Sequence, residues 1–153
     1  MKPVDILVAE DEPNDAFLLQ RAFDKTGVEI SLKFVRDGQE AIDYLQGHAP
    51  YDDRTAHPLP LMLLIDLKMP RLNGFDVIAF LRKQPLLRRM PVIVFTSSDI
   101  SADINRAYDL GANSYLLKPS NNAQLGLIAN SIHEYWCRYN RCPDCQPPSR
   151  VAP

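Results

Sequence analysis

The sequence lacks the features expected of membrane and secreted proteins. No apolar run is long enough to cross a bilayer, and the first five residues show no signal-peptide pattern. Cysteine is scarce: Cys137, Cys142 and Cys145 all lie near the C-terminus, an odd and local set that does not resemble a secreted disulfide framework. We therefore expect a cytoplasmic protein with no membrane partner.

A charge excess of one sign is also missing. The 17 basic and 19 acidic residues leave a net charge of −2, which gives no electrostatic reason to expect nucleic-acid binding. A chain of 153 residues has the size of one domain and can build a core without disulfides or metal. We expect this domain over residues 1–138, followed by a proline- and cysteine-containing tail, 139–153, that is poorly ordered.

Five apolar stretches alternate with five helical patterns. The expected strands are Val4–Ala9, Ile30–Val35, Leu61–Ile65, Pro91–Phe95 and Ser114–Leu117. The expected helices run from about 13 to 25, from Asp37 to about 46, and over about 74–83, 101–110 and 121–138. Such alternation predicts an α/β fold, a doubly wound parallel sheet with right-handed crossovers and helices on both faces. The proline-containing segment 47–60 is expected to be a surface loop.

Most of these strands end in a side chain that can do chemistry. The first ends at Glu10 and Asp11, the third at Asp66, the fourth at Thr96 and the fifth at Lys118. In a parallel sheet these ends share one edge, where ligands bind. Crowded carboxylates must be relieved by protonation or by a cation, and Mg²⁺ suits a site of few carboxylates.

This set of residues suits phosphoryl transfer. A carboxylate can attack phosphorus and become an aspartyl phosphate, while Lys118 and Thr96 would contact the phosphoryl oxygens. Each signal alone is weak, since an aspartate after a strand is more often a helix cap or turn residue. Four such groups at four strand ends, in this order, are hard to obtain by chance.

The motifs around these residues resemble those of response-regulator receiver domains, the phosphoacceptor modules of two-component signalling. The resemblance covers roughly residues 4–137 and rests on Ile6-Leu-Val-Ala-Glu-Asp11, Ile65-Asp-Leu-Lys-Met-Pro-Arg-Leu-Asn-Gly74, Val94-Phe-Thr-Ser-Ser98 and Gly111-Ala-Asn-Ser-Tyr-Leu-Leu-Lys-Pro119. It implies a flavodoxin-like (βα)5 fold with strand order 2-1-3-4-5.

The resemblance also implies residue roles. Asp66 would accept a phosphoryl group from a sensor histidine kinase, and Lys118 would pair with that group. Mg²⁺ would be held by Asp11, Asp66 and the backbone carbonyl of Lys68, with Glu10 acting through a metal-bound water. The chain would then catalyse only its own phosphorylation and dephosphorylation.

Two further pairs of residues have implied roles. Thr96 and Tyr115 would form the switch, although Tyr115 could be an ordinary strand aromatic. Lys68 and Ser98 would border the path of the attacking water and tune dephosphorylation, although Lys68 could be a plain solvated side chain.

The loop 47–60, Lys68 and the lack of a domain after the last helix resemble stand-alone regulators paired with bacterial and cyanobacterial phytochromes. The expected output is a protein contact, onward phosphotransfer or a homodimer through the fourth helix, fifth strand and fifth helix. Tyr135, Trp136 and Tyr139 would extend that dimer interface or cover the domain's own core.

Three alternatives concern the chemistry. His133, Cys137, Cys142 and Cys145 could form a zinc site, or the cysteines could be free thiols. A haloacid-dehalogenase-type phosphatase also uses an aspartate after a strand, but it needs an acid two residues later, where this chain has Lys68. A flavin-binding module or pseudo-receiver should lack part of the acid–threonine–lysine set, all of which is present here.

Overall fold

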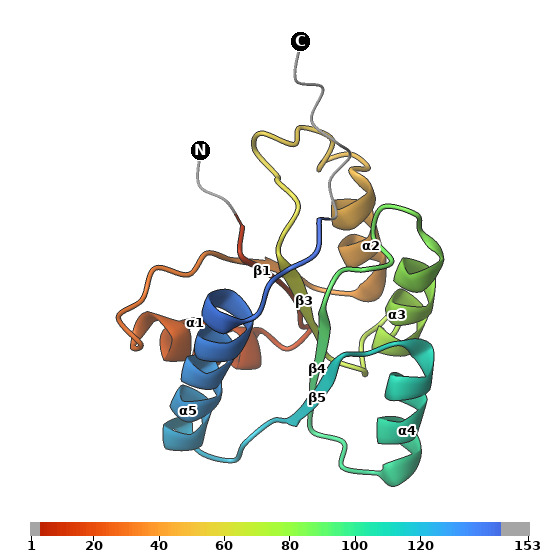
Figure 1. Ribbon diagram of the computed structural model, residues 1–153. Helices are drawn as coiled ribbons and strands as arrows, with labels where there is room; N and C mark the ends of the chain where they lie inside the picture. Colours follow the sequence, from red (N-terminus) through yellow and green to blue (C-terminus); the bar gives the residue numbers. More distant parts are fainter. Residues whose placement is uncertain (1–3, 145–153) are drawn as a thin grey trace.

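Five short parallel strands form one sheet at the centre of the computed structural model, which describes residues 4–144 (Figure 1). The strands are β1 (Ile6–Ala9), β2 (Leu32–Val35), β3 (Met62–Ile65), β4 (Val92–Thr96) and β5 (Ser114–Leu117), in the order β2-β1-β3-β4-β5. The α/β fold and its strand order are as predicted from the sequence, and the sheet has β2 and β5 at its edges.

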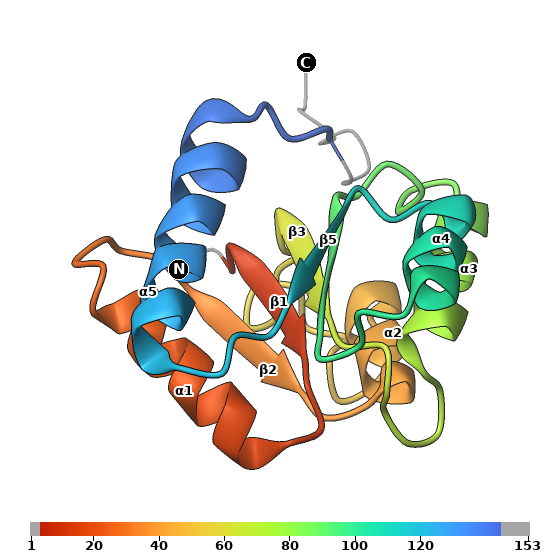
Figure 2. The same ribbon diagram turned by 90° about the horizontal axis from the view of Figure 1, so that it is seen from below.

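Helices cover both faces of this sheet. On one face lie α1 (Pro13–Asp24) and α5 (Asn122–Ile132), and on the other α2 (Gly38–Gln46), α3 (Gly74–Lys83) and α4 (Ser101–Leu110) (Figures 1 and 2). Successive strand residues therefore enter different cores: Leu7 packs with α2 and α3, whereas Ile6 and Val8 pack with α1 and α5. Burial on both faces explains why β1, β3 and β4 are almost entirely apolar.

The helix boundaries follow from local capping. Asp37 accepts a 2.8 Å hydrogen bond from the backbone N–H of Glu40 at the start of α2. Asn73 and Asp76 form a reciprocal capping box at the start of α3. Gly111 ends α4 at φ 112°, a left-handed conformation that glycine adopts without steric cost.

The C-terminal end of the domain differs from the expectation of one α-helix over 121–138. The α-helix ends at Ile132 and continues as a π-helix, η1 (His133–Tyr139). Its wider turn is visible in the 2.6 Å hydrogen bond from the Asn140 N–H to the Tyr135 carbonyl. Apolar spacing could not show this change, since side chains four apart lie close to one face in either helix.

The aromatic residues of η1 divide between core and surface. Trp136 and Cys137 pack against the α1–α5 core, whereas Tyr135 and Tyr139 are exposed. Trp136 therefore covers the domain's own core, and the two tyrosines expose apolar surface. Of the expected tail, residues 145–153 lie outside the described part of the chain. In residues 4–144 no helix is long and apolar enough to span a membrane.

Candidate functional site: an acidic cluster at the carboxyl edge of the sheet

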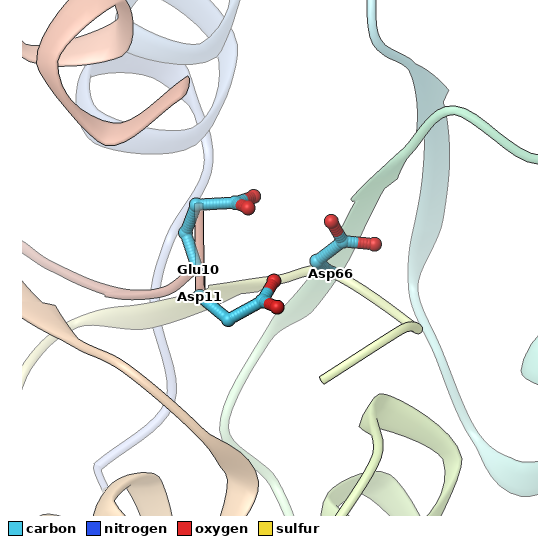
Figure 3. A group of neighbouring side chains, drawn as sticks. All are labelled: Glu10, Asp11 and Asp66. Atoms are coloured by element: carbon cyan, nitrogen blue, oxygen red, sulfur yellow. The ribbon is translucent and has the colours of Figure 1, made fainter. Parts of the chain in front are cut away.

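The carboxylates of Glu10, Asp11 and Asp66 point into one space at the carboxyl ends of β1 and β3 (Figure 3). The register explains this arrangement, because Ala9 pairs with Ile65 and the next residues, Glu10 and Asp66, leave the two strands side by side. Oxygen atoms of all three side chains lie within 4.8 Å of one another. Asp11 is exposed, whereas Glu10 and Asp66 are buried.

The backbone around Asp66 is fixed by the start of α3. The Asp66 N–H donates to the Ala9 carbonyl at 3.1 Å, and the Gly74 N–H donates to the Leu67 carbonyl at 3.0 Å. A Cβ atom on Gly74 would lie 2.4 Å from the Asp66 carbonyl oxygen, so only glycine permits this approach. The Asn-Gly pair after the strand therefore places the α3 N-terminus directly against the residue that carries the carboxylate.

Lys118 is the cation of the site. Its Nζ lies 2.7 Å from Glu10 Oε2, 2.7 Å from Asp66 Oδ2 and 2.9 Å from Asp15 Oδ2. The Lys118 N–H also donates to the Thr96 carbonyl at 2.8 Å, which fixes the start of the lysine beside β4. The sequence predicted the approach of Lys118 to Asp66. It did not predict Asp15, an acid in the first turn of α1 that resembles an ordinary helix-dipole residue.

Burial and ion pairing set the ionisation of this cluster. Burial raises the pKa of Glu10 to about 7, although the hydrogen bond and the charge of Lys118 work against this rise. Burial lowers the pKa of Lys118, but its hydrogen bonds to Asp66, Glu10 and Asp15 outweigh that effect and raise the pKa above its ordinary value. Lys118 is therefore charged, and the cluster as a whole carries excess negative charge.

Thr96 sits at the end of β4 with its side chain fully buried. Its hydroxyl oxygen has no hydrogen-bond partner within residues 4–144. An unsatisfied buried hydroxyl costs about 1–3 kcal/mol, and the Thr96 hydroxyl can donate to a partner brought to this edge of the sheet. A phosphoryl oxygen on Asp66 would be such a partner.

The other predicted residues lie just after β3, just after β4 and within β5. Tyr115 is half-buried against the α2–α3–α4 core, and its hydroxyl donates to the Ser98 carbonyl at 2.7 Å. The Ser98 hydroxyl in turn donates to Asp103 Oδ2 at 2.7 Å. Lys68 is exposed, and its backbone N–H lies 3.3 Å from Asp66 Oδ1.

Beside the carboxylates a cavity of about 610 Å³ is lined by Asp11, Lys68, Phe75 and Arg106, among others. The Arg106 guanidinium lies 4.1 Å from the centre of the Phe75 ring. Sequence reasoning did not identify Arg106, because nothing in the α4 pattern distinguishes it from a solvated arginine. The cavity thus opens beside Asp11 with two cations, Lys68 and Arg106, in its lining.

The donor set fits a hard divalent cation. Three carboxylates provide oxygen ligands, as Mg²⁺ prefers, and Lys118 supplies only one positive charge against them. Asp11 and Asp66, together with the Lys68 carbonyl, are the residues expected to hold such an ion. Glu10 is already engaged by Lys118, which suits the indirect role expected for it.

The second candidate metal site does not assemble in residues 4–144. Glu10, Asp11 and Asp66 are the one group of three or more potential ligands there, so His133, Cys137 and Cys142 do not converge. Burial raises the pKa of the Cys137 thiol to about 11, which disfavours the thiolate that zinc needs. Cys145 lies outside the described residues.

The fold and site correspond to a known family. Residues 6–130 match the family model for the response regulator receiver domain. The chain belongs to the response regulator receiver family of two-component signalling.

Three similar proteins show which members of this family the chain resembles. The probable methanogenesis regulatory protein FilR2 of Methanothrix harundinacea is 38% identical over 141 residues, which cover 92% of this chain and 88% of FilR2. The crystal structure of the phosphorylated cyanobacterial phytochrome response regulator RcpA superimposes with a TM-score of 0.85 at 34% identity, covering 94% of this chain and all of RcpA. The Mn²⁺-bound response regulator Rcp1 gives a TM-score of 0.82 at 32% identity over 92% of this chain and 99% of Rcp1.

Proposed function

We propose that Asp66 accepts a phosphoryl group in an Mg²⁺-dependent reaction and thereby switches a surface of this domain. The observation that carries the proposal is the convergence of Glu10, Asp11, Asp66 and Lys118 at the carboxyl edge of the sheet. The existence of an Mn²⁺-bound relative supports the assignment of a divalent cation to the acidic cluster.

In the reaction, an Asp66 oxygen attacks phosphorus as the bond from phosphorus to the donor breaks, and the donor atom leaves with the electron pair. Lys118 lies 2.7 Å from Asp66 and would pair with an oxygen of the incoming group. Mg²⁺ would neutralise charge on the phosphoryl oxygens. The buried Thr96 hydroxyl would donate to a further oxygen.

The conformational change would begin at Thr96. If its hydroxyl moves toward the phosphoryl group, the end of β4 moves with it, and the Tyr115 ring can turn inward behind it. The bond between Tyr115 and Ser98 joins the ring to the same β4–α4 turn. Lys68 follows β3 and Ser98 follows β4, and we propose that both tune the access of water to the acyl phosphate.

The proposed donor is a sensor histidine kinase. A phytochrome-type kinase is favoured because similar chains include a phytochrome response regulator of known structure. We further propose a cytoplasmic location, no nucleic-acid contact and an output surface built from α4, β5 and α5 that supports a homodimer. Each of these elements exposes a large apolar side chain: Tyr108 on α4, Leu117 on β5 and Leu127 on α5. The exposed Tyr135 and Tyr139 on η1 would extend the interface.

Intact-mass measurement after treatment with acetyl phosphate and Mg²⁺ tests the phosphoacceptor role. We expect one added phosphoryl group that is lost in Asp66→Asn and in the presence of a chelator. An adduct that persists in Asp66→Asn, or no adduct with any small donor, would contradict the proposal. Size-exclusion chromatography with and without beryllofluoride tests whether the switch alters dimerisation.

A further inference from the structure

Asp15 is a third carboxylate on Lys118, in addition to the two from the ends of β1 and β3. It projects from the first turn of α1, and its Oδ2 lies 2.9 Å from Lys118 Nζ. A lysine ammonium has three N–H donors, and the three carboxylates of Glu10, Asp66 and Asp15 engage all of them. A phosphoryl group on Asp66 must therefore share or displace an existing partner of Lys118.

The two other partners have reasons to release Lys118. Asp66 loses carboxylate charge when it becomes an acyl phosphate, and Glu10 lies next to the expected metal ion. Asp15 has neither reason, since it does not belong to the acidic group of three. Its carboxylate holds the ammonium on the α1 side and adds negative charge near the place where a phosphoryl dianion must arrive.

We propose that Asp15 is a positioning residue that restrains Lys118 and opposes phosphorylation of Asp66. The inference rests on the proposed phosphoacceptor function. Its physical basis is competition: Asp15 and a phosphoryl oxygen draw the same ammonium in different directions, and their negative charges repel each other.

The exposure of Asp15 sets the size of the effect. Its side chain is 41% exposed, against 5% for Glu10 and 9% for Asp66, so solvent screens its ion pair more than the other two. Exposed ion pairs are weak, and we therefore expect an effect of about two- to fivefold on rates. The same exposure means that a neutral side chain fits at position 15 without disturbing the core.

Four variants test the inference. Asp15→Asn and Asp15→Ser remove the charge, Asp15→Glu keeps it, and Asp24→Asn removes one charge from an exposed position at the far end of the same helix. With acetyl phosphate and Mg²⁺, we expect the first two to be phosphorylated about two- to fivefold faster than wild type. Asp15→Glu should approach wild type, and Asp24→Asn should equal it.

A second readout follows Lys118 directly without any phosphoryl donor. The ¹⁵N resonance of the Lys118 ammonium group should shift in Asp15→Asn and remain unchanged in Asp24→Asn. Circular dichroism checks that each variant is folded, and Asp15→Ser serves if Asp15→Asn is not.

The outcomes separate the inference from the function. If wild type gains a phosphoryl group on Asp66 but both neutral variants react at the rate of Asp24→Asn or more slowly, the role of Asp15 is wrong and the function stands. If wild type gains none, the function fails and the inference fails with it. An unchanged Lys118 resonance in Asp15→Asn would also overturn the proposal.

Discussion

The hydroxyl group of Tyr115 donates a 2.7 Å hydrogen bond to the backbone carbonyl oxygen of Ser98. This bond joins β5 to the turn after β4, two residues beyond Thr96, whose own hydroxyl is buried without a partner in the described chain. One hydroxyl is thus satisfied by the turn and the other is not. In the structure the two proposed switch residues are linked through the segment that would have to move.

Replacing Tyr115 by phenylalanine should destabilise the unphosphorylated domain. The change removes the hydroxyl that donates to the Ser98 carbonyl oxygen, while the aromatic ring keeps its packing against the core. We expect the free energy of unfolding to fall by about 1 kcal/mol. Urea unfolding measures this directly, and an unchanged midpoint would show that the bond contributes nothing to the resting state.

Replacing Thr96 by valine should raise the stability of the domain while weakening its binding of beryllofluoride. Valine has nearly the same shape as threonine and removes a buried hydroxyl that has no partner in residues 4–144, so the free energy of unfolding should rise by about 1 kcal/mol or more. Beryllofluoride binding should weaken, because the bound group loses one hydrogen-bond donor.

Serine at position 96 is the matched control for that experiment. It keeps the hydroxyl but loses a methyl group from a fully buried site. Thr96→Ser should therefore be less stable than wild type while retaining beryllofluoride binding. The opposite ranking of the two variants in stability and binding is the expected result; equal binding by both would exclude a role for the hydroxyl.

The strand ends explain why much of the site could be predicted from the sequence. Asp66 and Lys118 each follow a short strand directly and Thr96 is the last residue of one. Parallel strands bring their carboxyl ends to one edge. No side-chain detail is needed for that inference. The start of α2 was also predictable, because the capping hydrogen bond from the Glu40 N–H to Asp37 spans only three residues. The further hydrogen bonds that Asp37 accepts from Arg71, 34 positions away, had no local signal.

What the sequence did not reveal depends on contacts between distant segments. Asp15 contacts Lys118 across 103 positions of sequence. From the sequence alone, an acidic residue near a helix start is explained by its favourable interaction with the helix dipole. Arg54 donates hydrogen bonds to two backbone carbonyl groups of α2 from within segment 47–60. The prolines of that segment indicated only an irregular loop. The change from α5 to η1 keeps the apolar side chains on one side, so the pattern contains no sign of it.

The pKa of Glu10 predicts the sign of a pH dependence. Burial places it at about 7 in the folded chain, above the ordinary value of 4.5, so the folded form holds the proton more tightly. This contribution to stability is fully present below pH 4.5 and is lost as the pH rises through 7. Metal-free protein should thus lose up to about 3 kcal/mol of unfolding free energy over that interval.

Denaturant unfolding at several pH values, with a chelator, measures this loss. Glu10→Gln removes the titrating group, and the difference between wild type and variant isolates Glu10 from the histidines. Added Mg²⁺ should stabilise wild type increasingly as the pH rises, since carboxylates bind metal in their ionised form. A wild-type profile parallel to that of Glu10→Gln would contradict the assigned pKa.

Replacing Lys118 by methionine should expose the repulsion among the carboxylates. Glu10, Asp66 and Asp15 would lose their shared cation, and removing one partner of a buried ion pair costs about 3–5 kcal/mol. We expect a lower free energy of unfolding at pH 8 that Mg²⁺ or acidification partly restores. Lys83→Met, an exposed lysine on α3, is the control and should change stability little. Failure of Mg²⁺ to restore stability would argue against a metal site in this cluster.

Replacing Arg54 tests whether the contacts of segment 47–60 with α2 contribute to the stability of the fold. Its guanidinium donates to the carbonyls of Tyr44 and Leu45 at 2.7 Å each and to that of His57 at 3.1 Å. These bonds close the C-terminal end of α2, where carbonyl groups lack helical partners. Arg54→Ala should lower the free energy of unfolding by about 2–4 kcal/mol.

Arg54→Lys provides the graded comparison. The planar guanidinium group reaches carbonyl groups of both α2 and the loop, which a single lysine ammonium cannot do. The free energy of unfolding of Arg54→Lys should therefore lie between those of wild type and Arg54→Ala. Hydrogen exchange should quicken in segment 47–60 in both variants, while phosphorylation of Asp66 proceeds as in wild type because none of these contacts reaches the acidic cluster. If Arg54→Ala keeps wild-type stability and exchange, the loop holds its conformation without the arginine, and the aromatic contacts of Tyr44, Tyr51 and His57 are sufficient to hold it.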